Sequence, residues 1–132
     1  MNEKNKKVKV SEEALWDTEN YLCNYKFCRK LLAMRNYEKK YFDTMEWESE
    51  SPAEFTVARA KMFEIRHFVL DMENSSEKLL LYYHYIRGES IERCGELLGI
   101  SRSSAFRMKR RALEQAFLHS VKLGKNLAKE RF

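Results

Sequence analysis

The chain has 132 residues, a formal net charge of +5 and 44% hydrophobic residues. This length suits one domain with or without an appendage, since single cores commonly hold about 100 to 150 residues. With four glycines, one proline and no strand-like alternation, the sequence predicts an all-α fold. No apolar run reaches the roughly 20 residues that span a bilayer, and the chain starts without a secretory apolar core. We therefore expect a cytoplasmic protein with no membrane partner.

Cysteine and histidine residues do not assemble a recognisable reaction centre or metal site. The two cysteines that lie five residues apart have no second pair to complete a zinc site. The three histidines are scattered, and neither a His-Glu-x-x-His motif nor a glycine-rich phosphate loop is present. We predict that the chain is not an enzyme, that it binds no metal and no cofactor, and that its thiols are reduced. The cysteines are Cys23, Cys28 and Cys94.

The N-terminal half predicts a short arm followed by two long helices. Residues 1–10 contain four lysines and little apolar material, which indicates a flexible basic arm. Residues 11–74 should form an N-terminal helical region. Its first helix is expected from about 11 to 45, because a serine followed by two glutamates suits a helix start, with a break near Asn36. The second is expected from about 52 to 72, with proline in its favoured first turn.

Each of these helices has residues that could make an apolar face. For the first helix we expect Leu15, Cys23, Phe27, Leu31, Met34, Tyr41 and Met45 on that face. For the second we expect Phe55, Ala58, Met62, Ile65 and Val69.

The first helix carries more aromatic residues than one narrow stripe needs. Two interpretations stay open: a core packed against the second helix, or in addition a surface for a homodimer or for RNA polymerase. Arg29 and Asn36 interrupt the heptad seam that begins at Leu15, which disfavours a long parallel coiled coil.

Residues 88–111 predict two short helices joined by a sharp turn. Ser90 and Ser101 can N-cap the two helices, and Gly99 can take the left-handed conformation that ends the first one. Gly95 lies where the helices would cross, and a residue without a side chain lets the backbones approach. Such a pair is typical of a helix-turn-helix, whose second helix enters the major groove of DNA.

The second helix of this pair has an apolar and a cationic side. Ala105, Met108 and Ala112 repeat at helical spacing and should face inward. Arginine can bind guanine through two hydrogen bonds, and an apolar ring can touch a thymine methyl group. We predict base contacts from Arg102, Ser103, Phe106, Arg107 and Arg110. We predict phosphate contacts from Ser101, Ser104, Lys109, Arg111, Lys122 and Lys125.

Positive charge is concentrated in the second half of the chain. Residues 1–74 carry 13 Lys+Arg and 14 Asp+Glu, a balance of −1, whereas residues 75–132 carry 12 and 6, a balance of +6. A phosphate-binding surface requires such clustering. We divide this half into a helix-turn-helix module over 75–118 and a basic C-terminal helical tail over 119–132.

The module resembles region 4 of sigma factors of the sigma-70 type over residues 75–115. The matching segments are Leu79-Leu80-Leu81-Tyr82-Tyr83, Gly88-Glu89-Ser90, Leu97-Leu98-Gly99-Ile100-Ser101 and Arg110-Arg111-Ala112-Leu113. A small protein with N-terminal helices and one such module also resembles the phage late transcription regulators of the ArpU and RinA type. This resemblance implies binding to a promoter upstream of packaging and lysis genes, and activation of that promoter.

We therefore expect a sequence-specific, DNA-binding transcription regulator, an activator of bacteriophage or prophage late gene expression, that reads the major groove with residues 101–115. It would act in the cytoplasm of the bacterial host, associated with the nucleoid. Its expected partner is a double-stranded promoter or operator, joined by RNA polymerase or by a second copy through the N-terminal helices. The alternative is a protein-interaction adaptor that binds RNA polymerase or an antagonist without reading DNA.

Overall fold

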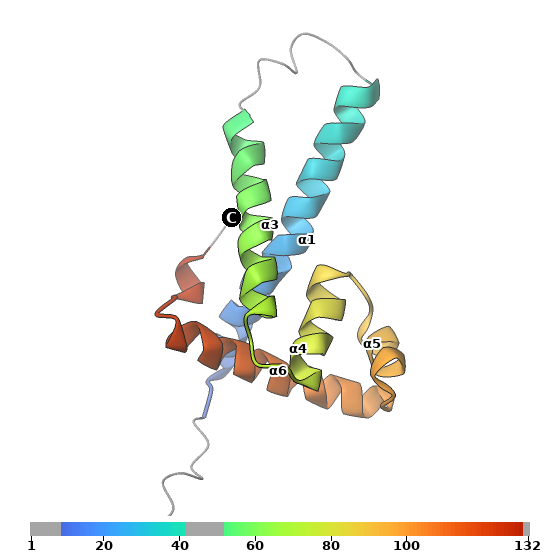
Figure 1. Ribbon diagram of the computed structural model, residues 1–132, viewed down its shortest axis with the longest axis vertical. Helices are drawn as coiled ribbons and strands as arrows, with labels where there is room; N and C mark the ends of the chain where they lie inside the picture. Colours follow the sequence, from blue (N-terminus) through green and yellow to red (C-terminus); the bar gives the residue numbers. More distant parts are fainter. Residues whose placement is uncertain (1–8, 42–51, 131–132) are drawn as a thin grey trace, which may run out of the picture.

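A computed structural model describes residues 9–41 and 52–130, and every regular element within them is helical (Figure 1). The predicted all-α class is therefore confirmed. The elements are α1 (Glu12–Tyr41), α3 (Pro52–Leu70), α4 (Ser76–Leu81), the π-helical turn η2 (Tyr82–Ile86), α5 (Ile91–Leu98), α6 (Arg102–Lys122) and the 3-10 turn η3 (Leu127–Lys129).

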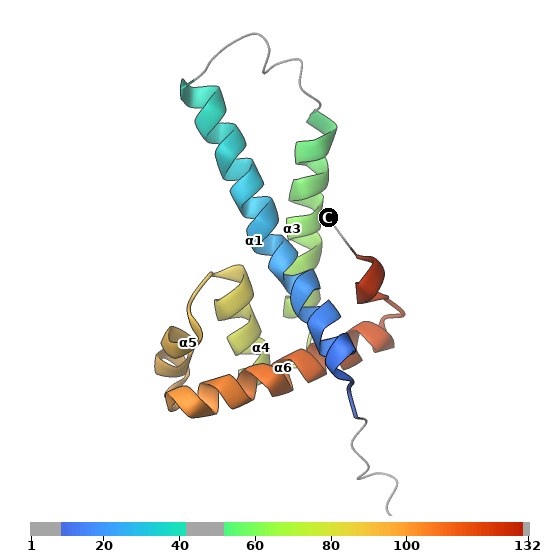
Figure 2. The same cartoon turned by 180° about the vertical axis from the view of Figure 1, so that it is seen from behind.

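α1 and α3 form a hairpin that rises from the rest of the molecule, while α6 crosses the base of that hairpin (Figure 1, Figure 2). α4 and α5 lie beside the hairpin, above the N-terminal half of α6. The break expected near Asn36 is absent, because α1 runs unbroken to Tyr41. A single exposed asparagine destabilises a helix by less than about 1 kcal/mol relative to alanine. The helix therefore continues past Asn36, because the residues on both sides favour it.

The predicted core face of α1 is wrong for most of its residues. Cys23, Phe27, Met34 and Tyr41 are exposed, Leu31 is half-buried, and Met45 lies outside the described residues. The buried residues are instead Leu15, Thr18, Tyr21, Leu22, Tyr25 and Cys28.

The reason is that α1 buries side chains with polar tips that find partners in the core. The Tyr21 hydroxyl donates to Glu64 of α3 at 2.6 Å. The Tyr25 hydroxyl accepts from Arg66 at 2.6 Å. A buried phenol costs little once its hydroxyl is hydrogen-bonded. A face chosen by hydrophobicity alone therefore selects the wrong side of this helix.

The expected apolar face of α3 is confirmed. Ala58, Ile65 and Val69 are buried, and Phe55 and Met62 are half-buried. Ile65 and Val69 belong to one continuous core that includes residues of α1, α3, α4, α5 and α6, and Met62 packs against it. The boundary predicted at 74/75 therefore separates no independent cores, and the boundary at 118/119 falls inside α6.

Val10, the last residue of the predicted basic arm, is 5% exposed and belongs to the core, so the prediction is wrong for this residue. Residues 1–8 lie outside the described residues. Lys9 is exposed at the start of the described chain. The apolar side chain of Val10 thus fixes the point at which the chain joins the fold.

The inner face of α6 consists mainly of small residues. Ala105, Ala112, Ala116 and Ser120 are at most 1% exposed. α1, α4 and α5 all pack against this helix. Small side chains let backbones approach closely, so one helix can serve as the common support for three others.

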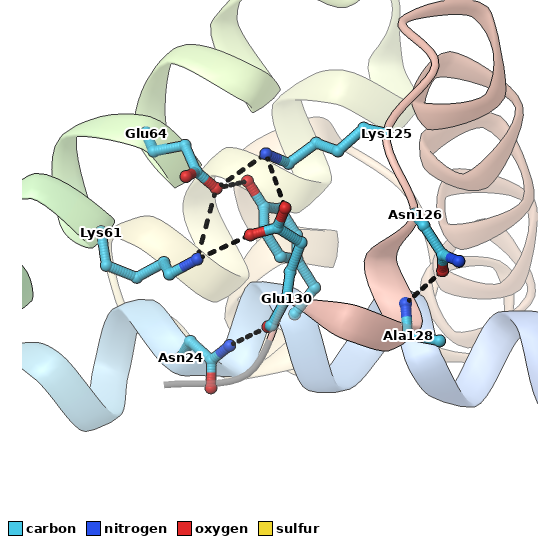
Figure 3. A network of polar contacts seen from close by, with 8 residues as sticks. Asn24, Lys61, Glu64, Lys125, Asn126, Ala128 and Glu130 are labelled. Carbon is cyan, nitrogen blue, oxygen red and sulfur yellow. Dashed lines mark hydrogen bonds and ion pairs between the residues drawn. The ribbon is translucent and has the colours of Figure 1, made fainter.

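The end of the chain is fastened to the hairpin by four charged residues, Lys61, Glu64, Lys125 and Glu130, which we call the C-terminal clasp (Figure 3). Lys61 Nζ lies 2.9 Å from Glu130 Oε2, and Lys125 Nζ lies 3.1 Å from Glu64 Oε2. Asn24 of α1 donates to the backbone carbonyl of Glu130 at 3.1 Å. Leu127 is buried and belongs to the core, so the segment after α6 belongs to the fold.

The clasp is expected to make the free energy of unfolding depend on pH in the acidic range. The hydrogen bond from Lys61 holds the pKa of Glu130 below its ordinary value of 4.5. A carboxylate whose pKa is lower in the folded than in the unfolded state stabilises the fold at pH values above its unfolded-state pKa. This stabilisation is lost as the pH falls through the folded-state pKa. Glu130→Gln should lower the free energy of unfolding at pH 7 by less than about 1 kcal/mol. The variant should also lose less of this free energy than the wild type when the pH falls below about 4.5. Urea unfolding at several pH values measures both effects.

The matched control is Glu73→Gln, which neutralises an exposed carboxylate between α3 and α4. It should leave the acid dependence of the wild type in place. If both variants change the pH profile equally, the clasp has no specific role in acid stability.

Candidate nucleic-acid interface

α5 and α6 are joined by three residues, 99–101, in the conformation that the sequence predicts. Ser90 Oγ accepts from the Arg93 amide at 3.1 Å and caps α5. Gly99 ends α5 with φ +71°, in the left-handed region. Ser101 Oγ accepts from the Ser104 amide at 3.2 Å and caps α6. All three expected roles are confirmed.

Gly95 lies at the close crossing of α5 and α6, as expected. A Cβ atom built at Gly95 would lie 3.3 Å from the Ala105 Cβ atom and 3.2 Å from the Ile100 carbonyl oxygen. Gly95 and Ala105 are both buried. The two small residues thus set the distance between the helices and the angle at which α6 leaves the turn.

The outer side of α6 carries the residues predicted to contact bases. Ala105, Met108 and Ala112 are buried as expected. Because helical residues repeat every 3.6 positions, Ser103, Arg107 and Arg110 lie on the side opposite to those three. The predicted base-contacting residues, all of them exposed, are Arg102, Ser103, Phe106, Arg107 and Arg110.

Three contacts orient the arginines in the first turns of α6. Arg102 Nε lies 3.2 Å from Glu92 Oε1 of α5, and its guanidinium carbon lies 5.7 Å from the centre of the Phe106 ring. An Arg107 guanidinium nitrogen donates to Ser104 Oγ at 3.2 Å. This end of α6 lies beside α5, away from the hairpin (Figure 2). Arg102 and Arg107 are both exposed there, so a large ligand can reach them.

Further along α6, carboxylates of α1 engage two of the predicted DNA-contacting residues. Lys109 Nζ lies 3.0 Å from Glu19 Oε2, and its side chain is only 28% exposed. Glu19 also accepts from the Tyr85 hydroxyl at 2.5 Å. Burial raises the pKa of Glu19, but hydrogen bonds from Tyr85 and Lys109 outweigh it and hold the pKa below its ordinary value. Lys109 therefore belongs to an internal ion pair.

Arg110 is paired with Glu12 of α1. Both side chains are mostly exposed, and the hydrogen bond from Arg110 holds the pKa of Glu12 below its ordinary value. Sequence reasoning did not connect these carboxylates with α6. Glu12 belongs to the acidic first turn of α1, which by itself indicates only a helix start, and no pattern in the sequence singles out Glu19.

The residues predicted to contact phosphates do not form one surface. Ser101 is exposed and Ser104 is half-buried at the start of α6, while Arg111 is exposed, with Nε 4.0 Å from Glu77 Oε1. Lys122 is exposed at the opposite end of α6, about 30 Å away along the helix. Lys125 is held in the C-terminal clasp and is 22% exposed. The candidate interface is therefore the N-terminal half of α6, Ser101 to Arg111, without Lys109, Lys122 and Lys125.

All three cysteines are free; Cys28 and Cys94 are buried, which raises the pKa of each thiol, whereas Cys23 is exposed. Residues 9–41 and 52–130 contain no cluster of three or more His, Cys, Asp or Glu side chains suited to a metal ion. No helix in these ranges is long and apolar enough to cross a membrane. Comparisons of the chain with protein-family models, curated proteins and solved structures found no match.

The cap of α6 can be tested by a matched pair of serine substitutions. Ser101→Ala removes the acceptor for the Ser104 amide and should lower the free energy of unfolding by about 1 kcal/mol. Ser103→Ala removes an exposed hydroxyl that lies 3.4 Å from Ser101 Oγ but does not accept from a backbone amide of α6, and it should change the free energy of unfolding by less than about 0.5 kcal/mol. Chemical denaturation of both variants measures the difference. Equal effects would contradict the assignment of Ser101 as the cap.

Proposed function

We propose that this chain is a sequence-specific DNA-binding transcription regulator that inserts the N-terminal half of α6 into the major groove. The observation that carries this proposal is the joint exposure of Arg102, Ser103, Phe106 and Arg107 at the end of α6 that lies away from the hairpin. α5 lies across this end and can brace it on the DNA backbone. The serine caps and the left-handed Gly99 supply the sharp turn that this docking requires.

The residues of this surface divide between reading bases and holding phosphates. Arg107 keeps guanidinium donors beyond the one that binds Ser104, and a bidentate contact with guanine is worth about 1 to 3 kcal/mol of discrimination. Phe106 is 45% exposed and can contact a thymine methyl group. Arg111 and Ser101 neutralise or bind phosphates, which adds affinity without sequence information.

Arg110 joins the interface when a DNA phosphate replaces the Glu12 carboxylate as its ion-pair partner. Ion pairs between exposed side chains are weak in water, whereas duplex DNA presents one negative charge about every 1.7 Å along its axis. A phosphate can therefore replace the Glu12 carboxylate. Lys109 is the contrasting case, because its pair with Glu19 is mostly buried and shared with Tyr85.

The regulatory role we propose is activation of bacteriophage late genes, for which the resemblance to region 4 of sigma factors and to the ArpU and RinA type is the support. One such module covers few base pairs and competes with many non-specific sites. Contact with RNA polymerase beside the promoter supplies the additional binding free energy. The module would then only bind the promoter sequence, and RNA polymerase would melt the duplex.

The division of roles can be tested with two arginine substitutions. Arg107→Ala should reduce the preference for the specific duplex over a random one by roughly tenfold, since one base contact is lost. Arg111→Ala should weaken binding to all duplexes and lower the salt slope by about 1. Gel-shift titrations at several salt concentrations, with duplexes from the neighbouring genome and a random competitor, measure both effects.

Two outcomes of this titration would count against the proposal. If both variants lose only non-specific affinity, the assignment of base and phosphate contacts is wrong. If the wild-type chain binds no duplex at low salt, DNA binding itself is wrong, and the adaptor that binds polymerase or an antagonist becomes the better account.

The carboxylate of Glu12 competes with DNA for Arg110, so its removal should strengthen binding. Glu12→Gln should raise the affinity for every duplex by up to about fivefold, because one exposed ion pair need no longer be broken. Glu13→Gln removes the same charge from the next residue, whereas the ion pair of Arg110 is with Glu12, and it should have a smaller effect. Fluorescence anisotropy with a labelled duplex distinguishes the two. Equal gains would show a general charge effect and no competition at Arg110.

A further inference from the structure

Six apolar or weakly polar side chains are exposed along one side of α1. Five of them are between 55% and 63% exposed, and the sixth, Cys23, is also exposed. They are Trp16, Cys23, Phe27, Met34, Tyr37 and Tyr41, which we call the outer stripe. Isolated surface hydrophobics are normal, but several exposed apolar side chains aligned on one side of a long helix indicate an interaction surface.

The outer stripe has the spacing of a coiled coil. Its positions, together with Asn20 and Lys30, follow alternating steps of four and three residues from 16 to 41, which is the spacing of heptad a and d positions. This seam lies opposite the buried face that contains Leu22 and Tyr25. Single polar residues in such a seam fix the register of the partner helix.

The charges of α1 are distributed unequally along its length. Residues 12–26 carry four acidic side chains and one lysine, a balance of −3. Residues 27–41 carry five basic side chains and one glutamate, a balance of +4. A helix that is acidic in its first half and basic in its second is complementary to a copy of itself running in the opposite direction.

We propose that the outer stripes of two copies pair in antiparallel orientation and form a symmetric dimer. A two-fold axis midway between Phe27 and Lys30 places every seam position opposite another one, because the seam positions are spaced symmetrically on either side of that midpoint. The paired layers are Trp16 with Tyr41, Asn20 with Tyr37, Cys23 with Met34, and Phe27 with Lys30.

These layers are chemically compatible as well as in register. The Lys30 ammonium meets the Phe27 ring, an arrangement that favours cation–π attraction, and Asn20 can exchange hydrogen bonds with the Tyr37 hydroxyl. Aromatic side chains offer roughly 150 to 250 Å² each, so the four in the stripe, at their exposure, provide about 1,000 Å² over two copies. Met34 and Cys23 bring the area near the roughly 1,200 Å² at which specific interfaces begin.

For the function proposed above, on which this step rests, the dimer has a consequence for DNA. α6 meets α1 near Glu12 and Glu19, at one end of each paired helix. At a rise of about 1.5 Å per residue, Trp16 of the two copies would lie about 37 Å apart along the helix axis. One turn of B-form DNA is about 34 to 36 Å, so the dimer could present two α6 helices to half-sites one turn apart.

The dimer is tested on the full chain without DNA, so the result does not depend on the proposed function. At about 100 µM chain, a dissociation constant near 10 µM gives mostly dimer. Sedimentation velocity should show a dimer for the wild type and a monomer for the double variant Phe27→Glu, Met34→Glu. The control is Val57→Glu, Phe63→Glu, which charges two equally exposed residues of α3 and should remain dimeric. Circular dichroism checks that all chains stay helical.

Cross-linking tests the orientation. Cys23 is the exposed cysteine, and the other two are buried, so Met34→Cys should form an intermolecular disulfide with Cys23 on mild oxidation. Parallel pairing would instead join Cys23 to Cys23 in the wild type, which would overturn the antiparallel arrangement. A wild type that stays monomeric, or a dimer that survives the stripe double variant, would overturn the proposal as a whole.

Discussion

The structure depends on the close packing that small side chains allow along the inner face of α6. Ala105, Ala112, Ala116 and Ser120 are almost completely buried, and α1, α4 and α5 all pack on this helix. Protein interiors have little free volume, so larger side chains there would push several helices apart together. The same helical register that turns these residues inward turns Ser103 and Arg107 outward. The core of the protein and its candidate interface are thus two sides of one helix.

The fold reduces the cationic surface that the charge distribution suggests. Residues 75–132 have a balance of +6, but Lys109 is neutralised by Glu19 and Lys125 by the C-terminal clasp. Arg110 is engaged by Glu12, although that pair is exposed. The arginines at the start of α6 remain the most accessible cations of the interface. The acidic first half of α1 therefore confines the proposed DNA contact to a short region.

α1 has an unusual role because both of its faces are apolar in character. Its inner face buries leucine, threonine, tyrosine and cysteine side chains. The buried tyrosine hydroxyl groups form hydrogen bonds with Glu64 and Arg66 of α3. Its outer stripe exposes Trp16, Phe27 and Met34. A helix that is apolar on several sides is usually enclosed by partners. This property links the misassigned core face of α1 to the dimer that we propose.

Features that depend on neighbouring residues could be predicted from the sequence. Serine caps at 90 and 101, the left-handed Gly99 and the close crossing at Gly95 are local chemistry, and each was predicted correctly. The core face of α1 and the pairing of its carboxylates with Lys109 and Arg110 depend on how distant helices pack, and the sequence did not predict them. These contacts join residues about 90 positions or more apart in the chain. Hydrophobic periodicity does not reveal which polar groups such distant elements bring together.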